Sequence, residues 1–479
     1  MNTDKLPSRK ENFSEWYNQL VIKAELADYA PVRGCMVVRP YGWALWENIQ
    51  EALDRRFKAT GHVNAAFPLF IPMSFMEKEK EHVEGFSPEL AVVTHGGGQK
   101  LEEPLIVRPT SETVIGHMYS KWINSYRDLP VLINQWGSVV RWEMRTKLFL
   151  RTTEFYWQEG HTAHATYDEA QEETLKMLDV YADFAITDAA VPVLKGRKSD
   201  SEKFAGALRS YTIEAMMGDK RALQSGTSHN LGQNFAQAFD ILYLDKNNER
   251  QFCWTTSWGL STRFIGAIIM THGDDQGLIL PPNLAPYQVI MIPIYRNDAE
   301  KSSVVPVVER IEKMLRASSI RVKVDNREEV TPGFKFNDWE MRGVPLRIEV
   351  GPRDVIKESV AFARRDMPGK AGKSFVPQEN LAESVKRTLN EIQASLLDKA
   401  TTFRDTNIHQ VSSGSSLTEL IQEGWAFGWW CGREECEEKI KGDTKATSRC
   451  IPLDQSEQQG VCFYCGKPAS EKSYFARAY

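Results

Sequence analysis

Two β-type runs that nearly adjoin restrict the fold of this chain more than any other feature. The runs "LPVLINQWGSVVRWE" (129–143) and "RTTEFYWQEGHTAH" (151–164) are rich in valine, isoleucine, threonine and aromatic residues, which favour strands. Two such runs with a turn between them are typical of an antiparallel hairpin. We therefore expect an antiparallel pair of strands in this part of the chain.

Helical patterns flank this pair. Segment 41–60 repeats apolar residues every four positions and ends at Gly61, and segment 167–186 has the pattern of a long surface helix. A further strand, 252–261, runs directly into a helical segment, 262–273. Segment 62–72 also predicts a strand, closed by prolines, and "QSGTSHN" (224–230) has the composition of a turn.

A chain of 479 residues is too long for one core and predicts several domains. Adjacent prolines followed by a buried β run, in "GLILPPNLAPYQVIMIPIY", mark one boundary. Helical and strand patterns then alternate to about residue 400, as in a small α/β domain, and a Trp- and Cys-rich region follows. We expect domains at 1–283, 284–400 and 401–479.

Composition narrows the class of protein. Hydrophobic content of 42% and charged content of 26% are ordinary for a globular chain, and a net charge of −5 gives no overall attraction to nucleic acid. The first 20 residues contain no apolar signal region, and no apolar run approaches the roughly 20 residues that span a bilayer. We therefore expect a cytoplasmic protein without a membrane segment.

The hairpin region crowds together residues that suit a nucleotide. An arginine can hold a phosphate bidentately, a nearby glutamate can orient it, and an aromatic face can stack on a purine. The residues are Arg141, Glu143, Arg151, Phe155 and Trp157. The alternative to a nucleotide site is an ordinary hairpin, with aromatic side chains in the core and charged side chains in solvent.

The common nucleotide motifs are absent. "PGKAGKS" ends like a P-loop, but that motif needs glycine where Met367 stands, and no helix pattern follows. No glycine-rich dinucleotide motif follows a strand either.

Three distant segments indicate a family by their order. "FPLFIP", Arg141-x-Glu143 and "SWGLSTRFIGAII" resemble the three motifs of class II aminoacyl-tRNA synthetases. The blocks "RPTSETVI", "FLRTTEFYWQEGHT", "GTSHNLGQNF" and "SWGLSTR" resemble prolyl-tRNA synthetases, from about Asn12 to the last residue. The ending "YFARAY" and the cysteine-rich tail are similar to the archaeal and eukaryotic-like branch of that family.

The resemblance implies an α+β multidomain fold. Its parts would be a class II antiparallel sheet flanked by helices, a small α/β anticodon-binding domain and a C-terminal α+β zinc-binding domain. The implied activity is ATP-dependent formation of prolyl-adenylate from L-proline, followed by transfer to tRNA(Pro). The implied assembly is a homodimer, because the first motif of this class lies at the subunit interface.

The resemblance also implies an ATP site. Catalytic roles would fall to Arg141, Arg263 and Glu143. ATP contacts would come from Arg141, Arg151, Phe155, Gln224, Thr227, Ser261 and Arg263. Arg141 would hold the α-phosphate and the proline carboxylate, Phe155 would stack on adenine, and Gln224 would contact Mg²⁺, which needs few protein ligands beside phosphates.

The proline pocket implied by the resemblance combines polar and aromatic groups. Its residues would be Thr110, Glu112, Arg141, Trp157, Phe204 and His229. Glu112 also suits the first turn of a helix, where the macrodipole favours a carboxylate, and both descriptions can hold. "VTHGGGQK" (93–100) predicts a flap over the substrate, with His95 a structural part of it.

The second domain carries a local excess of positive charge. Between Arg321 and Lys373 the sequence has 12 Lys or Arg and 9 Asp or Glu, an excess of three positive charges in a chain of net charge −5. Such a face suits a tRNA backbone. We expect Glu340 and Arg347 to read anticodon bases, although a charged segment is commonly just a solvated face.

Four cysteines in the third region suit a closed, structural zinc site. Cys431 and Cys436 form one pair, and Cys462 and Cys465 form a second in "CFYCG". Cys450 lies between the pairs and is an alternative ligand, whereas Cys35 and Cys253 suit buried thiols.

Three alternatives stay open on sequence alone. A non-catalytic paralogue would be expected to lose phosphate-binding arginines, and a threonine-specific relative would be expected to place zinc ligands in the catalytic site, where none are evident. Tyr479 either brings its carboxylate near the active site, as the resemblance suggests, or frays.

Overall fold

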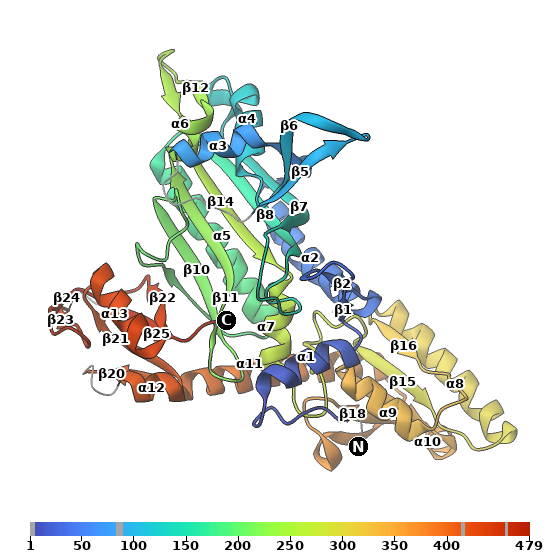
Figure 1. The fold of residues 1–479 in the computed structure, drawn as a ribbon. Coiled ribbons are helices and arrows are strands. Elements are labelled where there is room, and N and C mark those ends of the chain that lie inside the picture. Colours follow the sequence, from blue (N-terminus) through green and yellow to red (C-terminus); the bar gives the residue numbers. More distant parts are fainter. Residues whose placement is uncertain (1–4, 83–89, 413–416, 456–457) are drawn as a thin grey trace.

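A computed structural model describes residues 5–82, 90–412, 417–455 and 458–479. A large, mostly antiparallel sheet runs through the molecule (Figure 1). Its strands, in spatial order, are β20 (Ile408–Val411), β21 (Trp425–Trp430), β25 (Glu471–Ala476), β22 (Thr447–Pro452), β9 (Val193–Arg197), β10 (Arg209–Met216), β11 (Ala222–Gly232), β14 (Trp254–Ser261), β8 (Glu154–His164), β7 (Val131–Val140) and β3 (Val63–Asn64).

The expected hairpin is confirmed. β7 and β8 pair antiparallel along their whole length, from Val131 opposite Ala163 to Val140 opposite Glu154. The connection, residues 141–153, is longer than a tight turn and carries two of the expected arginines. β14 pairs antiparallel with the other edge of β8 and continues into α7 (Arg263–His272), as the sequence predicts.

The expected long helices are also present. α2 (Pro40–Ala59) and α5 (Tyr167–Thr187) pack together, and α5 also contacts β11 and β14. Thr166 and Glu169 form a reciprocal capping box that fixes the start of α5. Apolar residues of both helices join the largest core of the protein, which holds this part of the sheet rigid beneath the site described below.

Two local predictions are wrong. Segment 62–72 is not one strand: β3 joins β7, while β4 (Phe70–Pro72) pairs with β6 (Gln99–Val107), which pairs with β5 (Ala91–Gly96). Between β3 and β4, the Phe67 amide, next to Pro68, donates a hydrogen bond to the Gln135 side chain instead of to the backbone of a neighbouring strand. Segment 224–230 is not a turn but part of β11, because hydrogen bonds from β10 and β14 outweigh its turn-like composition.

The expected α/β region has its own sheet and apolar core. Its strands in spatial order are β16 (Val322–Val324), β15 (Val289–Pro293), β17 (Leu346–Val350), β18 (Ser359–Arg364) and β19 (Lys373–Pro377). Parallel pairing of β15 with β16 and β17 gives way to antiparallel pairing at β18 and β19. Helices α8 (Asp298–Ala317), α9 (Pro332–Met341), α10 (Pro352–Ile356) and α11 (Leu381–Thr406) accompany it.

The third region shares the large sheet instead of forming a separate layer. β22 pairs with β9 through Ile451 opposite Arg197 and Pro452 opposite Gly196. A side chain at Gly196 would meet the Ile451 carbonyl oxygen at 2.3 Å, so only glycine allows this approach. Helices α12 (Leu417–Glu423) and α13 (Glu434–Thr444) and the strands β23 (Gly460–Val461) and β24 (Pro468–Ala469) complete the region.

The remaining elements are short or peripheral. They are α1 (Phe13–Lys23), β1 (Ala27–Tyr29), β2 (Met36–Val38), α3 (Met73–His82), α4 (Glu112–Trp122), α6 (Asn234–Phe239), β12 (Leu242–Leu244), β13 (Arg250–Phe252) and the 3-10 turns Tyr126–Asp128 and Gly369–Gly372. In the described part of the chain, no helix combines the length and the apolar character needed to cross a bilayer.

A buried ion pair fastens the α/β region to the end of α7. Arg365 donates to both carboxylate oxygens of Asp274, at 2.8 and 2.5 Å, and to the Glu340 carbonyl at 3.1 Å. The Arg365 side chain is 3% exposed. Backbone bonds from Leu278 to Met341 and from Leu280 to Gly343 reinforce the same junction.

We expect Arg365→Met to lower the free energy of unfolding by about 3 kcal/mol, because it leaves Asp274 half-buried without its partner. Urea unfolding followed by tryptophan fluorescence measures the loss. The matched control is Arg316→Met, which breaks an exposed pair with Glu312 on α8 and should cost less than about 0.5 kcal/mol. Equal losses in the two variants would contradict a fastening role.

Candidate active site

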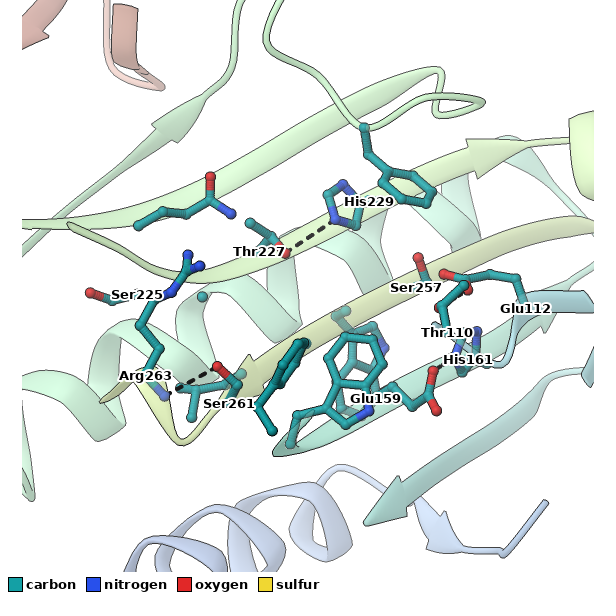
Figure 2. Close-up of a pocket in the computed structure, with 18 of the residues that line it drawn as sticks. Thr110, Glu112, Glu159, His161, Ser225, Thr227, His229, Ser257, Ser261 and Arg263 are labelled. Carbon is teal, nitrogen blue, oxygen red and sulfur yellow. Dashed lines mark hydrogen bonds and ion pairs between the residues drawn. The ribbon is translucent and has the colours of Figure 1, made fainter. Parts of the chain in front are cut away.

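A cavity of about 250 Å³ opens on one face of β8, β11 and β14 (Figure 2). Alternate residues of β8 point into it, namely Phe155, Trp157, Glu159 and His161. Of the residues predicted from the sequence, the cavity is lined by Thr110, Glu112, Arg141, Phe155, Trp157, Phe204, Gln224, Thr227, His229, Ser261 and Arg263. Residues up to 153 positions apart in the sequence thus surround one small space.

The first turn of α4 forms an acidic end of the cavity. Glu112, which is 8% exposed, is the first residue of α4 and accepts a hydrogen bond from the Thr110 hydroxyl. The Ser111 amide, next to it, donates to Glu159 at 3.1 Å. Both descriptions of Glu112 therefore apply: it lies where the helix dipole favours a carboxylate, and it faces the cavity.

An ion pair that the sequence reading missed supports this end. His161 Nε2 lies 3.0 Å from Glu159 Oε2. Burial alone would lower the pKa of His161, but the hydrogen bond with Glu159 and the charges of Glu112 and Glu159 raise it above its ordinary value. Burial would raise the pKa of Glu159, but His161, Ser111 and Gln135 lower it. The pair is therefore charged and internally satisfied.

Aromatic rings form the walls next to the acidic end. The rings of Phe204 and His229 lie 4.9 Å apart between centroids. Burial, together with the positive charge of Lys198, lowers the pKa of His229 to about 3, so this ring is neutral. Its nitrogens hydrogen bond with the hydroxyls of Ser210 at 2.8 Å and Thr227 at 3.1 Å. These contacts fix the ring as a shaped, uncharged wall.

Arg141 lies between the acidic end and a second, cationic space. Its Nε donates to the Pro109 carbonyl at 3.0 Å, and its guanidinium lies over the rings of Phe155 and Trp157, at 5.5 and 5.4 Å. Burial lowers the pKa of Arg141, and the charges of Glu112 and Glu159 partly oppose that shift. Arg141 can therefore reach a ligand from either side.

A second cavity, of about 690 Å³, adjoins the first and shares Arg141, Phe155, Ser261 and Arg263 with it. Glu143 and Arg151 line this second cavity and form an ion pair there. Burial and the positive charges of Arg141 and Arg151 lower the pKa of Arg263 to about 10. Like charges gathered in this way indicate a site for a polyanion.

Tyr479 also lines the cationic cavity, where hydrogen bonds hold it. Its amide donates to the Ala222 carbonyl at 3.1 Å, and its hydroxyl donates to Asp219 at 2.6 Å. Arg221 lies over its ring at 4.5 Å.

The sequence did not point to ten of the residues that line the first cavity. They are Glu159, His161, Lys198, Glu202, Ser225, Gly226, Ser257, Trp258, Gly259 and Leu260. Alternation along β8 from Trp157, and along β14 from Ser261, could have found Glu159, His161, Gly259 and Ser257. Lys198 and Glu202 lie at and after the end of β9, where no periodic pattern marks them.

The Glu159–His161 pair also bears on metal binding. Single ligand atoms of Glu112, Glu159 and His161 lie within 4.8 Å of one another. These three side chains could hold a metal ion, although the sequence alone shows no metal ligands in this pocket. The hydrogen bonds that Glu159 already makes to Ser111, Gln135 and His161 nevertheless occupy its oxygens.

The four cysteines of the third region lie together. Ligand sulfurs of Cys431, Cys436, Cys462 and Cys465 fall within 4.8 Å of one another. Two sulfur pairs are 3.9 and 3.6 Å apart, close to the ~3.8 Å separation of thiolates around tetrahedral zinc with Zn–S bonds of ~2.3 Å. Partial burial would raise the pKa of Cys465, but the Lys467 amide and neighbouring thiols lower it to about 7. This donor set fits Zn²⁺.

The other three cysteines lie outside this cluster. Cys450 is buried in β22 beside Gly196 and is not among the four grouped ligands, so it is no substitute for them. Cys253 is buried as expected, whereas Cys35 is only half-buried.

Glu340 and Arg347 meet in a third cavity, of about 120 Å³, in the α/β region. Arg347 Nη1 lies 2.8 Å from Glu340 Oε1, and its guanidinium lies over Phe336 at 4.1 Å. Lys373 and Arg364 line the same cavity. A carboxylate acceptor next to a planar guanidinium donor can hydrogen bond to the edge of a nucleobase.

Comparisons with known proteins agree along the whole chain. Residues 93–272 match the tRNA synthetase class II core domain (G, H, P, S and T), residues 288–388 an anticodon binding domain, and residues 416–479 the C-terminal domain of prolyl-tRNA synthetase. The proline–tRNA ligase of Roseiflexus castenholzii is 58% identical over all of both chains.

More distant relatives align almost as completely. The chloroplastic/mitochondrial proline–tRNA ligase of Arabidopsis thaliana is 56% identical over 98% of this chain and 88% of its own. The crystal structure of the prolyl-tRNA synthetase of Cryptosporidium parvum, complexed with halofuginone and AMPPNP, superposes with a TM-score of 0.94 at 42% identity and covers 99% of both chains.

The Glu159–His161 pair predicts how stability depends on pH. The folded-state pKa of His161 is raised, so the stabilisation by its charge is complete below its unfolded pKa of ~6.5 and is lost as pH rises through the folded value. We therefore expect His161→Gln to cost more stability at pH 6 than at pH 9. Thermal unfolding midpoints across this range measure the difference.

The control is His164→Gln, because burial lowers the pKa of His164 to about 4. That ring opposes folding as pH falls below its unfolded pKa, so the stability difference should change in the opposite direction. Parallel pH profiles for the two variants would exclude a charged His161.

Proposed function

Since the chain belongs to the prolyl-tRNA synthetase family, we propose that it is a proline–tRNA ligase that activates L-proline with ATP and transfers the product to tRNA(Pro). One observation carries the residue roles: two adjoining cavities, one acidic and aromatic and the other rich in arginine, share Arg141 at their boundary. The acidic, aromatic end suits the ammonium and apolar ring of proline, and the arginine-rich end suits the phosphates of ATP. The expected domains, 1–283, 284–400 and 401–479, remain part of this proposal.

The proline end would recognise a secondary ammonium on an apolar ring. Glu112, oriented by Thr110, would pair with the ammonium, and Trp157, Phe204 and His229 would enclose the ring. The neutral state of His229 supports this role, because a charged ring there would repel the ammonium. Arg141 would then hold the carboxylate at the boundary between the two ends.

The ATP end would promote an in-line displacement. A proline carboxylate oxygen attacks the α-phosphorus, the bond to the bridging oxygen breaks, and pyrophosphate leaves with prolyl-adenylate formed. Arg141 would neutralise charge at the α-phosphate, Arg151 and Arg263 would hold the far phosphates, and Phe155 would stack on adenine. Glu143 would orient Arg151 through their ion pair.

Gln224, Thr227 and Ser261 would complete the ATP site. The Gln224 side-chain oxygen is a neutral ligand of the kind Mg²⁺ accepts beside phosphates. Magnesium would supply further neutralisation of phosphate charge. The 3′-terminal hydroxyl of the tRNA then attacks the prolyl carbonyl carbon, and AMP leaves.

The third cavity would read the anticodon. Glu340 and Arg347 present an acceptor and a fork of donors, which can address base edges. The excess of basic residues between Arg321 and Lys373 would contact the tRNA backbone.

We propose a homodimer that covers the β3 edge of the sheet. β3 is the last strand on its side, and Val63 in β3 and other large apolar side chains among residues 29–122 are exposed. The exposed residues in this part of the chain are Tyr29, Val32, Val37, Val63, Leu69, Phe70, Val92 and Trp122. Zinc at the four cysteines and a cytoplasmic location remain predictions as well.

Exchange of pyrophosphate into ATP tests the activity directly. We expect exchange that depends on L-proline, and we expect Arg141→Ala to reduce it at least ~10²–10³-fold, because the arginine neutralises charge that develops in the transition state. Arg209→Ala, an exposed arginine outside the cavities, is the control and should keep the wild-type rate.

Three results would contradict the proposal. Wild-type protein without exchange would support a non-catalytic paralogue, exchange that depends on threonine would indicate a different amino acid, and an active Arg141→Ala variant would refute the role of that residue.

Zinc at the four cysteines predicts a further result. We expect about one zinc per chain in protein purified without chelators, and less zinc and a lower melting temperature in Cys462→Ser, with a smaller effect on exchange. Cys450→Ser is the control, because that thiol lies outside the cluster. Mass spectrometry of metal content decides: no zinc in the wild type would refute the site, and a second zinc would point to the Glu112–Glu159–His161 group.

A further inference from the structure

A buried ion pair joins the third region to the strand beside the candidate ATP site. Glu214 on β10 and Arg449 on β22 are separated by 235 residues, and their side chains are 0% and 8% exposed. Arg449 Nε and Nη2 donate to the two Glu214 oxygens at 3.2, 3.1 and 3.0 Å. The contact is therefore bidentate and shielded from water.

Neighbouring hydroxyls complete the pair. Thr212 donates to Glu214 Oε1 at 3.0 Å, and Arg449 Nη1 donates to the Thr447 hydroxyl at 2.9 Å. A buried carboxylate held in this way has little freedom to turn to another cation.

Glu214 lies on the strand next to the one that carries Gln224, a residue of the first cavity. In the β10–β11 ladder it is opposite Gln224, next to the irregularity that brings both Gln224 and Ser225 to the cavity. Its negative charge and the positive charge of Arg449 both act on Lys198 and Arg263, with opposite sign. The charges of Glu214 and Arg449 therefore influence two cations that line the cavity, Lys198 and Arg263.

Lys198 and Arg263 are not neutralised by an ion pair with a carboxylate in the described part of the chain. Among the described residues, neither Lys198 nor Arg263 has an ion-pair partner within 4.0 Å, and Arg263 is oriented by the Leu150 carbonyl at 3.0 Å instead. A buried carboxylate that lost its partner would either take up a proton or pair with another cation, and the charge of Glu214 already acts on Lys198 and Arg263. Without Arg449, Glu214 would compete with ATP for Lys198 and Arg263.

We propose that Arg449 is a positioning residue for ATP binding: by occupying both oxygens of Glu214, it keeps Lys198 and Arg263 available to the phosphates. The inference rests on the proposed function, because it presupposes that this cavity binds ATP. It assigns the third region a role in substrate binding that differs from metal-dependent stability. It also assigns Lys198 a phosphate contact that the sequence reading did not name.

The test separates charge competition from simple structural damage. ATP affinity is measured by isothermal titration calorimetry, which does not depend on turnover. We expect Arg449→Met to weaken ATP binding at least about tenfold, because it frees Glu214. The double variant Glu214→Gln/Arg449→Met should recover ATP affinity to within about twofold of the wild type, although it also lacks the bridge to β22.

Arg197→Met is the matched control. Arg197 Nη2 on β9 donates to both oxygens of Glu471 at the same junction, at 2.8 and 2.7 Å, and its removal leaves Glu214 paired with Arg449. Its ATP affinity should equal that of the wild type. If Arg449→Met does not fold, Arg449→Lys, which keeps the charge but loses the fork, should weaken ATP binding less than tenfold and be rescued by Glu214→Gln.

The outcomes are distinct. Unchanged ATP affinity in folded Arg449→Met, or equal loss in the single and double variants, would overturn the inference. A wild-type protein that binds ATP but shows no proline-dependent exchange would instead refute the proposed function and leave this result standing. A wild-type protein that does not bind ATP would overturn both.

Discussion

The site depends on arginines that are oriented by neutral acceptors. Arg141 and Arg263 each donate Nε to a backbone carbonyl, of Pro109 and Leu150, at 3.0 Å. A carbonyl fixes the direction of a guanidinium without cancelling its charge, so the two residues keep a positive potential in a buried space. The two like charges repel each other, which destabilises the folded state, and the packing of the sheet on its large core offsets this. A bound polyanion would relieve the repulsion.

One strand supplies the opposite polarity. Alternate positions of β8 carry Phe155 and Trp157 beneath Arg141, and then Glu159 and His161 at the acidic end. Because side chains alternate along a strand, four residues spaced by two set the order of surfaces that a ligand meets. The Glu159–His161 pair does not need to touch the ligand, since its contacts with Ser111 hold the first turn of α4, where Glu112 begins the helix.

Much of this could be predicted from the sequence, and the exceptions have physical causes. The β7–β8 hairpin, α2, α5 and the passage from β14 to α7 follow from local periodicity, and the resemblance brought Thr110, Arg141 and Arg263 to one site. Segments 62–72 and 224–230 were assigned wrongly because a non-local contact, the Gln135 side chain in one case and the β10 and β14 ladders in the other, overrides composition. No local sequence pattern marks Lys198 or the Glu214–Arg449 pair, because these residues come together only when distant strands join in the sheet.

The shared sheet also changes how the four cysteines should be understood. Cys436 lies in the first turn of α13, and the next residue, Glu437, accepts hydrogen bonds from Ser199 at 3.1 Å and Ser201 at 2.5 Å. Ser199 directly follows Lys198 and Ser201 lies two positions further on, so the helix that carries Cys436 also anchors the segment beside the first cavity. On β11, the Ala222 amide, two residues before Gln224, donates to the Arg477 carbonyl at 2.8 Å. A metal that orders the third region would therefore act on the proposed ATP site through backbone and side-chain contacts already present, without approaching the reacting atoms.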